Sequence, residues 1–252
     1  MKNNRYILLL TAALMFFSNP SAARMNFRED VNFDVRIGLN EGAVTPVPLP
    51  VEIRRLTSYD ILFEPTLDAG ARYDFSGNFG VRAGLRLEIK DMVGGADVKN
   101  YSMVITGDDG NEISGYWTGI VDTDVRGLML TIPIDASFKV SDRVRLTAGP
   151  YVSFVLNRKF AGQVYDGYLR EGSPVGDKIA FYDGAYSDYD FTQHMRKTQV
   201  GVAAGIDCDV ATSFLFSAAL RWGLNGVFKD SFETITFPMF PVYLNIGFGY
   251  KF

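Results

Sequence analysis

The chain has 252 residues, of which 47% are hydrophobic and 14% aromatic, and its formal net charge at pH 7 is -4. This acidic balance, with no basic cluster, argues against a nucleic-acid-binding protein, so no nucleic acid is expected as a partner. Beyond the N-terminus no apolar stretch reaches the roughly 20 residues that a membrane-spanning helix needs. The content of Gly, Tyr and Phe favours strands and turns over helices.

The first residues have the features of an export signal. Lys2 and Arg5 precede a short apolar run, residues 6–17, and small residues follow up to Ala23. This order predicts a signal peptide, residues 1–23, which is cleaved after Ala23, and a β-barrel domain, residues 24–252. A membrane anchor is the alternative interpretation, for which the apolar run is too short. Cys208 is the only cysteine and cannot form an intramolecular disulfide.

Alternation of apolar and polar residues with a period of two recurs along the rest of the chain. Each stretch has about ten residues, the length of a tilted strand that crosses a bilayer. Eight strands are therefore expected, at residues 31–40, 66–74, 79–90, 128–140, 144–156, 199–210, 214–222 and 243–252.

The expected connections alternate between short and long. Short turns are predicted near Ser76, Ser141 and Thr212. Short turns at one end and long loops at the other are typical of a barrel with periplasmic turns and extracellular loops. The fold class predicted is thus all-β, an eight-stranded antiparallel up-and-down transmembrane β-barrel in the outer membrane. The four long loops expected are residues 41–59, 91–126, 158–193 and 225–237.

Alternation alone does not say which face meets water, because a soluble β-sandwich or lipocalin-like barrel also alternates. Two apolar rows, in residues 128–140 and 144–156, run without a polar interruption. The opposite rows mix glycines with long charged residues, as in Gly80, Arg82 and Gly84. Such mixing fits a narrow polar lumen, and aromatic residues at the strand ends fit the girdles of a membrane barrel. We therefore expect apolar rows that face outer-membrane lipid and lipopolysaccharide.

The last stretch, YLNIGFGYKF, alternates up to Phe252. It is expected to pair with the strand that starts near Val31 and so to complete the barrel, because strand edges are not tolerated in lipid. The terminal Phe252 resembles the signal that the barrel-assembly machinery reads, which makes this machinery an expected partner.

Several motifs resemble one family. LTIPIDASFKV followed by LTAGPYVSFVLN, then GVAAGIDCDV and the terminal GFGYKF, is similar to the small outer-membrane β-barrels common in Bacteroidetes, the PorT-type family. Each motif alone is weak, and their order and spacing carry the resemblance over the mature chain. The resemblance implies an eight-stranded barrel and no defined activity, and no residue carries over the secretion role of the relative that gives the family its name.

The polar row predicted to face the lumen holds charges of both signs in similar numbers. An eight-stranded barrel is just wide enough for its own side chains, so these charges are expected to pair into a plug. The alternative is a narrow path for ions or small solutes. The charges are Arg36, Arg72, Arg82, Arg86, Lys90, Lys139, Arg145 and Arg221, with Asp34, Asp68, Asp74, Glu88, Asp135, Asp207 and Asp209.

The sequence offers little for an enzyme. The only histidine, His194, follows Ser187, Asp188 and Asp190 in a predicted loop, a spacing that does not establish a triad. No nucleophile elbow is present. We expect no enzyme, no catalytic residue and no cofactor, and a lipid-modifying or proteolytic barrel stays the alternative.

Clusters of acidic, aromatic and glycine residues mark the long loops. Asp108, Asp109 and Glu112 share a turn, but their spacing does not match a calcium loop, so no metal site is expected. Tyrosines that alternate with Asp and Gly resemble adaptable contact surfaces. The function predicted is a structural or surface-binding role, with an extracellular ligand at the loops of residues 91–126 and 158–193.

Overall fold

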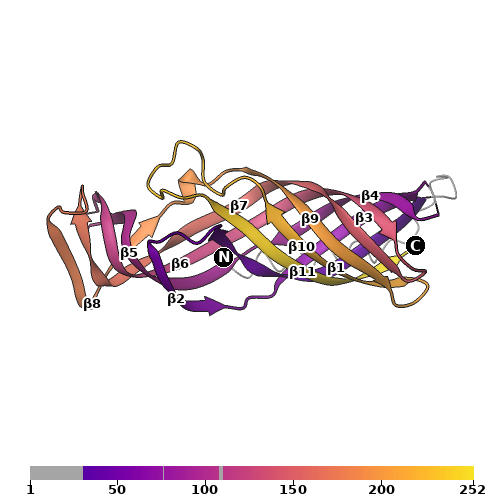
Figure 1. The fold of residues 1–252 in the computed structure, drawn as a ribbon, viewed down its shortest axis with the longest axis horizontal. Coiled ribbons are helices and arrows are strands. Elements are labelled where there is room, and N and C mark those ends of the chain that lie inside the picture. Colours follow the sequence, from indigo (N-terminus) through magenta and orange to yellow (C-terminus); the bar gives the residue numbers. More distant parts are fainter. Residues whose placement is uncertain (1–30, 76, 108–109) are drawn as a thin grey trace.

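The structure, a computed structural model, describes residues 31–75, 77–107 and 110–252. These residues form one antiparallel sheet, whose strands run obliquely along an elongated molecule (Figure 1). No helix in the described ranges is long and apolar enough to cross a membrane. The strands are β1 (Val31–Pro46), β2 (Ile53–Asp60), β3 (Glu64–Asp74), β4 (Phe79–Ile89), β5 (Met92–Thr106), β6 (Glu112–Lys139), β7 (Val144–Glu171), β8 (Lys178–Asp190), β9 (Thr198–Asp209), β10 (Phe214–Gly223) and β11 (Met239–Lys251), and a 3-10 turn, η2, covers Thr192–His194.

Eight strands are linked in one continuous series of hydrogen-bonded pairs. Their order is β6-β4-β3-β1-β11-β10-β9-β7, and β7 pairs again with β6. We call these eight strands the ring. The expected pairing of the first and last stretches is confirmed, with Asp34 opposite Lys251 and Pro46 opposite Met239.

The expected count of eight strands is corrected to eleven within the described residues. All eight predicted stretches are strands, but β2, β5 and β8 lie in segments expected to be loops. Strands β6 and β7 have 28 residues each, far more than the ten or so expected, because they continue into the same segments. In these segments, glycines in crowded positions and polar residues interrupt the apolar rows. The period-two alternation that identifies a strand is therefore less evident from the sequence.

Beyond the ring, the long strands form a second region, which we call the extension. It consists of β2, β5, β8, residues 112–125 of β6 and residues 161–171 of β7. Here β2 pairs with β5, β5 with β6, and β8 with β7. In Figure 1 the extension occupies the end of the molecule opposite to the chain's C-terminus. The short turns at residues 140–143 and 210–213 lie at the other end, as expected, whereas Ser76 is outside the described residues.

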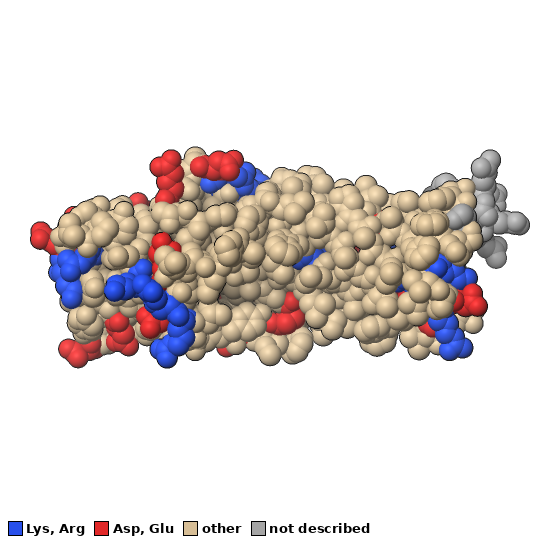
Figure 2. All heavy atoms as spheres, in the orientation of Figure 1, with Lys and Arg blue, Asp and Glu red and all other residues tan. Residues whose placement is uncertain are grey.

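The ring has apolar side chains outside and charged side chains inside, as the sequence predicted. On β11, Leu244, Ile246 and Phe248 are 43%, 44% and 60% exposed, whereas Asn245 between them is 4% exposed. Lys, Arg, Asp and Glu gather mainly at the two ends of the face in Figure 2, with a largely uncharged surface between them. This distribution is the reverse of that in a soluble β-sandwich.

An apolar core fills the extension. Its largest side chain is Trp117, which is fully buried and packs edge-on against Phe181 at 5.5 Å between ring centroids. Val121 and Val125 point into this core from β6, so Asp122 and Asp124 between them point to the other side of the strand. The loop between β10 and β11 covers the core with Phe228, Phe232 and Phe237.

Candidate functional site

The lumen of the ring is crossed by ion pairs. Arg36 contacts Asp207 at 2.8 Å and Asp34 at 2.7 Å, and Arg72 contacts Asp207 at 3.4 Å. Because β1, β3 and β9 supply these residues, the pairs join distant parts of the ring. All four side chains are less than 10% exposed.

A second chain of contacts continues along β4. Arg82 contacts Asp34 at 2.6 Å and also pairs with Asp68, which in turn contacts Arg86 at 2.9 Å. The predicted pairing of lumen charges is thus confirmed for these residues. Lys139 differs from the expectation: it pairs with Asp142 of the neighbouring turn at 3.0 Å.

Towards the extension, the lumen holds a cluster around Glu88. Lys90 contacts Glu88 at 3.1 Å, and Thr131 donates a hydrogen bond to it at 2.6 Å. The guanidinium of Arg221 lies over the ring of Tyr151, 5.7 Å from its centroid. Ion pairs therefore fill the interior of the ring, and the apolar core begins where the ring meets the extension.

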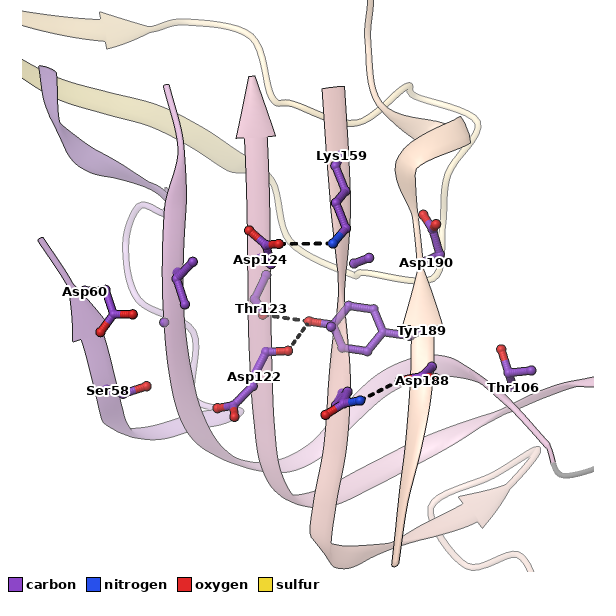
Figure 3. A pocket seen from close by; sticks show the side chains of 15 residues that line it. Ser58, Asp60, Thr106, Asp122, Thr123, Asp124, Lys159, Asp188, Tyr189 and Asp190 are labelled. Atoms are coloured by element: carbon purple, nitrogen blue, oxygen red, sulfur yellow. Dashed lines mark hydrogen bonds and ion pairs between the residues drawn. The ribbon is translucent and has the colours of Figure 1, made fainter. Parts of the chain in front are cut away.

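A polar cavity lies in the extension (Figure 3). Its volume is about 630 Å³, and five carboxylates face a single ammonium group among its lining residues. Strands β2, β5, β6, β7 and β8 all contribute. The charged lining residues are Asp60, Asp122, Asp124, Asp188, Asp190 and Lys159.

Hydrogen bonds hold several of these carboxylates in place. Asp124 accepts from Lys159 at 3.0 Å, and Asp188 accepts from Gln163 at 2.9 Å (Figure 3). Asp190 accepts from the backbone N–H of Thr192 at 2.7 Å. Within the described residues, only Asp124 among the five carboxylates forms ion pairs, with Lys159 and with Arg126, so the cavity keeps an excess of negative charge.

Tyr189 anchors the floor of the cavity. Its hydroxyl donates to the carbonyl of Asp122 at 2.9 Å and lies 2.7 Å from the hydroxyl of Thr123. Burial raises the pKa of the Tyr189 hydroxyl, so it keeps its proton and remains a donor. The contact ties β8 to β6 across β7.

The residues considered for an enzyme do not assemble. His194 stacks on Phe232, with ring centroids 4.6 Å apart, and Ser187 donates to the carbonyl of Thr106 at 2.6 Å. In the described part of the chain, no hydrogen bond links His194 to Ser187, Asp188 or Asp190.

The described residues contain no group of three or more His, Cys, Asp or Glu side chains placed to hold a metal ion. Glu112 begins β6 and is exposed, while Asp108 and Asp109 lie outside the described residues. The carboxylates of the polar cavity are spread over β2, β6 and β8.

The two segments where the sequence predicted a ligand, residues 91–126 and 158–193, supply most of the cavity lining, and Asp188 and Asp190 were named there for another role. Asp60, Asp122 and Asp124 were missed. Asp122 and Asp124 alternate with Val121, Thr123 and Val125, which is the same period-two signal that identified the ring strands. Reading that alternation as a strand would have placed both carboxylates on one face of β6. Asp60 gives no comparable signal.

The chain was compared with known protein families. The model of the outer membrane protein beta-barrel domain family matches residues 17–229. The chain belongs to this family. Its location is accordingly the outer membrane, as the sequence predicted. No curated protein matches the chain.

Solved structures of outer-membrane proteins are similar to this member of the family. The attachment invasion locus protein Ail of Yersinia pestis is 13% identical, with a TM-score of 0.39 over 88% of this chain and 99% of that chain. Neisserial surface protein A is 10% identical, with a TM-score of 0.35 over 89% and 98%. OprG from Pseudomonas aeruginosa is 13% identical, with a TM-score of 0.35 over 88% and 95%.

The lumen network makes a prediction about stability. Asp207→Asn removes the charge that two buried guanidinium groups share, Arg36 and Arg72. Arg72 then has no ion-pair partner among the described residues and Arg36 keeps only Asp34, so the free energy of unfolding should fall by about 3–5 kcal/mol. Urea unfolding in lipid vesicles should show the loss as a lower midpoint. The control Asp142→Asn, at an exposed turn, should leave the midpoint unchanged; equal midpoints for both variants would contradict the importance of the network.

Proposed function

We propose that the ring is an eight-stranded barrel that crosses the outer membrane, with its short turns in the periplasm and its extension outside the cell. The apolar side chains that point outward and the charged side chains that point inward support this placement, because lipid favours apolar side chains and excludes charged ones. On the order and spacing of LTIPIDASFKV, LTAGPYVSFVLN and GVAAGIDCDV, we also propose that the chain is one of the PorT-type barrels.

We propose that the extension is a binding surface for a positively charged partner, such as a basic segment of a protein. The observation that carries the proposal is the polar cavity, where five carboxylates face one ammonium group. Strands fix the carboxylates more precisely than loops would, which lowers the entropy cost of binding. The proposed role is not enzymatic. The proposed lipid partners are the outer-membrane lipid and lipopolysaccharide that surround the barrel.

The cavity can be tested with a basic peptide. Asp60 and Asp188 line it and are exposed, so Asp60→Asn with Asp188→Asn removes two charges at little structural cost. A lysine decapeptide should bind this variant in nanodiscs about tenfold more weakly at low salt, equivalent to about 1.4 kcal/mol. Binding is measured by fluorescence anisotropy.

A matched variant controls for overall charge. Asp166 and Asp183 are exposed, lie outside the cavity lining, and have positive φ, which Asn tolerates. Asp166→Asn with Asp183→Asn should change the affinity by less than about twofold. Equal weakening by both double variants would mean that the peptide senses general charge and not this cavity.

A narrow channel is the competing function. The ion pairs between Arg82, Asp34 and Asp68 favour a plugged lumen over a conducting one. Planar bilayers with the purified protein should therefore show no steady conductance, under conditions in which a general porin conducts. A stable open channel would contradict the plug and support passage of ions or small solutes.

A further inference from the structure

The wall of the molecule has a gap between β1 and β2. Strand β3 starts at Glu64, which pairs with Asn40, while β1 continues to Pro46. Residues 41–46 of β1 are paired with β11 on one edge. On the other edge, within the described residues, no strand pairs with them. Strand β2 lies on this side but pairs with β5.

Side-chain contacts hold only one end of this gap. The hydroxyl of Tyr59 donates to Glu41 at 2.5 Å and lies 2.8 Å from the carbonyl oxygen of Gly42. Glu41 also accepts from the backbone N–H groups of Leu62 and Phe63. In the described part of the chain no hydrogen bond joins residues 43–46 to β2, so the gap can widen there without loss of a backbone pair.

An apolar cavity of about 150 Å³ lies behind the gap. Both edges of the gap line it, Ala43 and Thr45 from β1 and Leu56 from β2. Behind them lie Phe160, Met239 and other side chains of the apolar core. The cavity has room for several methylene groups and offers few polar partners, which suits a hydrocarbon chain.

The gap lies at the height where the outward apolar surface ends. Ala43 is opposite Val242 of β11, and Val242 is opposite Trp222 of β10. Trp222 is 41% exposed, and exposed tryptophans favour the boundary between hydrocarbon and headgroups. Immediately below the gap, Ile37 and Leu39 are exposed on β1. The cavity is therefore continuous with the proposed lipid-facing surface.

Two arginines lie on β2, the strand that forms one edge of the gap. Arg54 and Arg55 are adjacent and exposed, and Arg55 has only a long contact to Asp97, 3.8 Å. Val51 and Leu56, which are 78% and 66% exposed, lie close to them in the sequence, and Leu56 lines the cavity. Two guanidinium groups on a strand that borders an apolar cavity match a phosphate group attached to hydrocarbon.

We propose that the gap between β1 and β2 takes up part of one acyl chain of a phosphate-bearing lipid from the surrounding outer leaflet. Several methylene groups of the chain lie in the apolar cavity, and the lipid phosphate contacts Arg54 and Arg55. The inference rests on the proposed membrane placement, and it adds a lipid site distinct from the polar cavity.

Native mass spectrometry of the folded, detergent-purified protein tests the site with dioleoyl phosphatidic acid as the probe. Wild-type protein should retain one lipid molecule through detergent removal. Ala96→Phe, which fills the cavity, should lower this occupancy at least tenfold, and Ala136→Phe, on the exposed apolar surface of β6, should leave it unchanged. Equal occupancy in wild type and Ala96→Phe would overturn the proposal.

Two further experiments separate the contribution of the lipid headgroup from effects of the substitutions on folding. Arg54→Glu with Arg55→Glu should reduce retention of phosphatidic acid to that of dioleoylglycerol, which has the same acyl chains and no phosphate; an unchanged preference for phosphatidic acid over dioleoylglycerol would overturn the role of phosphate. Thr45→Cys in a Cys208→Ser background, blocked with benzyl maleimide after folding, fills the cavity without affecting assembly. Undiminished lipid retention after blocking would overturn the site. A gel shift on heating reports the folded barrel separately, so a failed membrane placement is distinguishable from a failed lipid site.

Discussion

The structure depends on one constraint: apart from residues 41–46 of β1, the ring strands find partners for their backbone groups in the strands on either side. A strand in hydrocarbon has no water to satisfy an unpaired N–H or C=O group, and each such group costs several kcal/mol. The pairing of β1 with β11, the ring strands farthest apart in the sequence, and the pairing of the consecutive strands β6 and β7 provide these partners. The outward side chains are then free to be apolar, and the inward ones must accommodate a narrow interior.

That interior accounts for the charged residues. Asp34, Asp68 and Asp207 each contact at least one buried arginine, and several arginines bridge two carboxylates. Glycine positions leave room for these long side chains: a Cβ at Gly70 would collide with the guanidinium of Arg82. In the extension the interior is an apolar core. The strands there carry their polar side chains on the outward face. Ion pairs thus fill one part of the interior, and apolar side chains fill the other.

The sequence predicted the ring well and the extension poorly, for physical reasons. Ring strands have uninterrupted apolar rows on their outward side, as in residues 128–140. Extension strands face water and a small core, and residues such as Gly115 and Gly162 fit where neighbouring backbone leaves no space for a side chain. Such strands have mixed rows that resemble loops. The carboxylates of the polar cavity converge from three strands, β2, β6 and β8, and this convergence depends on pairings that no local pattern specifies. The gap between β1 and β2 depends on where β3 starts relative to the end of β1, which is again a property of the register.

The orientation of the ring strands is the central claim, and β11 tests it most directly. Nitroxide side chains attached one at a time at positions 244 to 248, in a Cys208→Ser background, report whether each position contacts lipid or the polar interior. In lipid vesicles, accessibility to oxygen relative to a water-soluble nickel complex should be high at 244, 246 and 248 and low at 245 and 247. A reversed pattern, or equal access of the nickel complex at every position, would contradict the account.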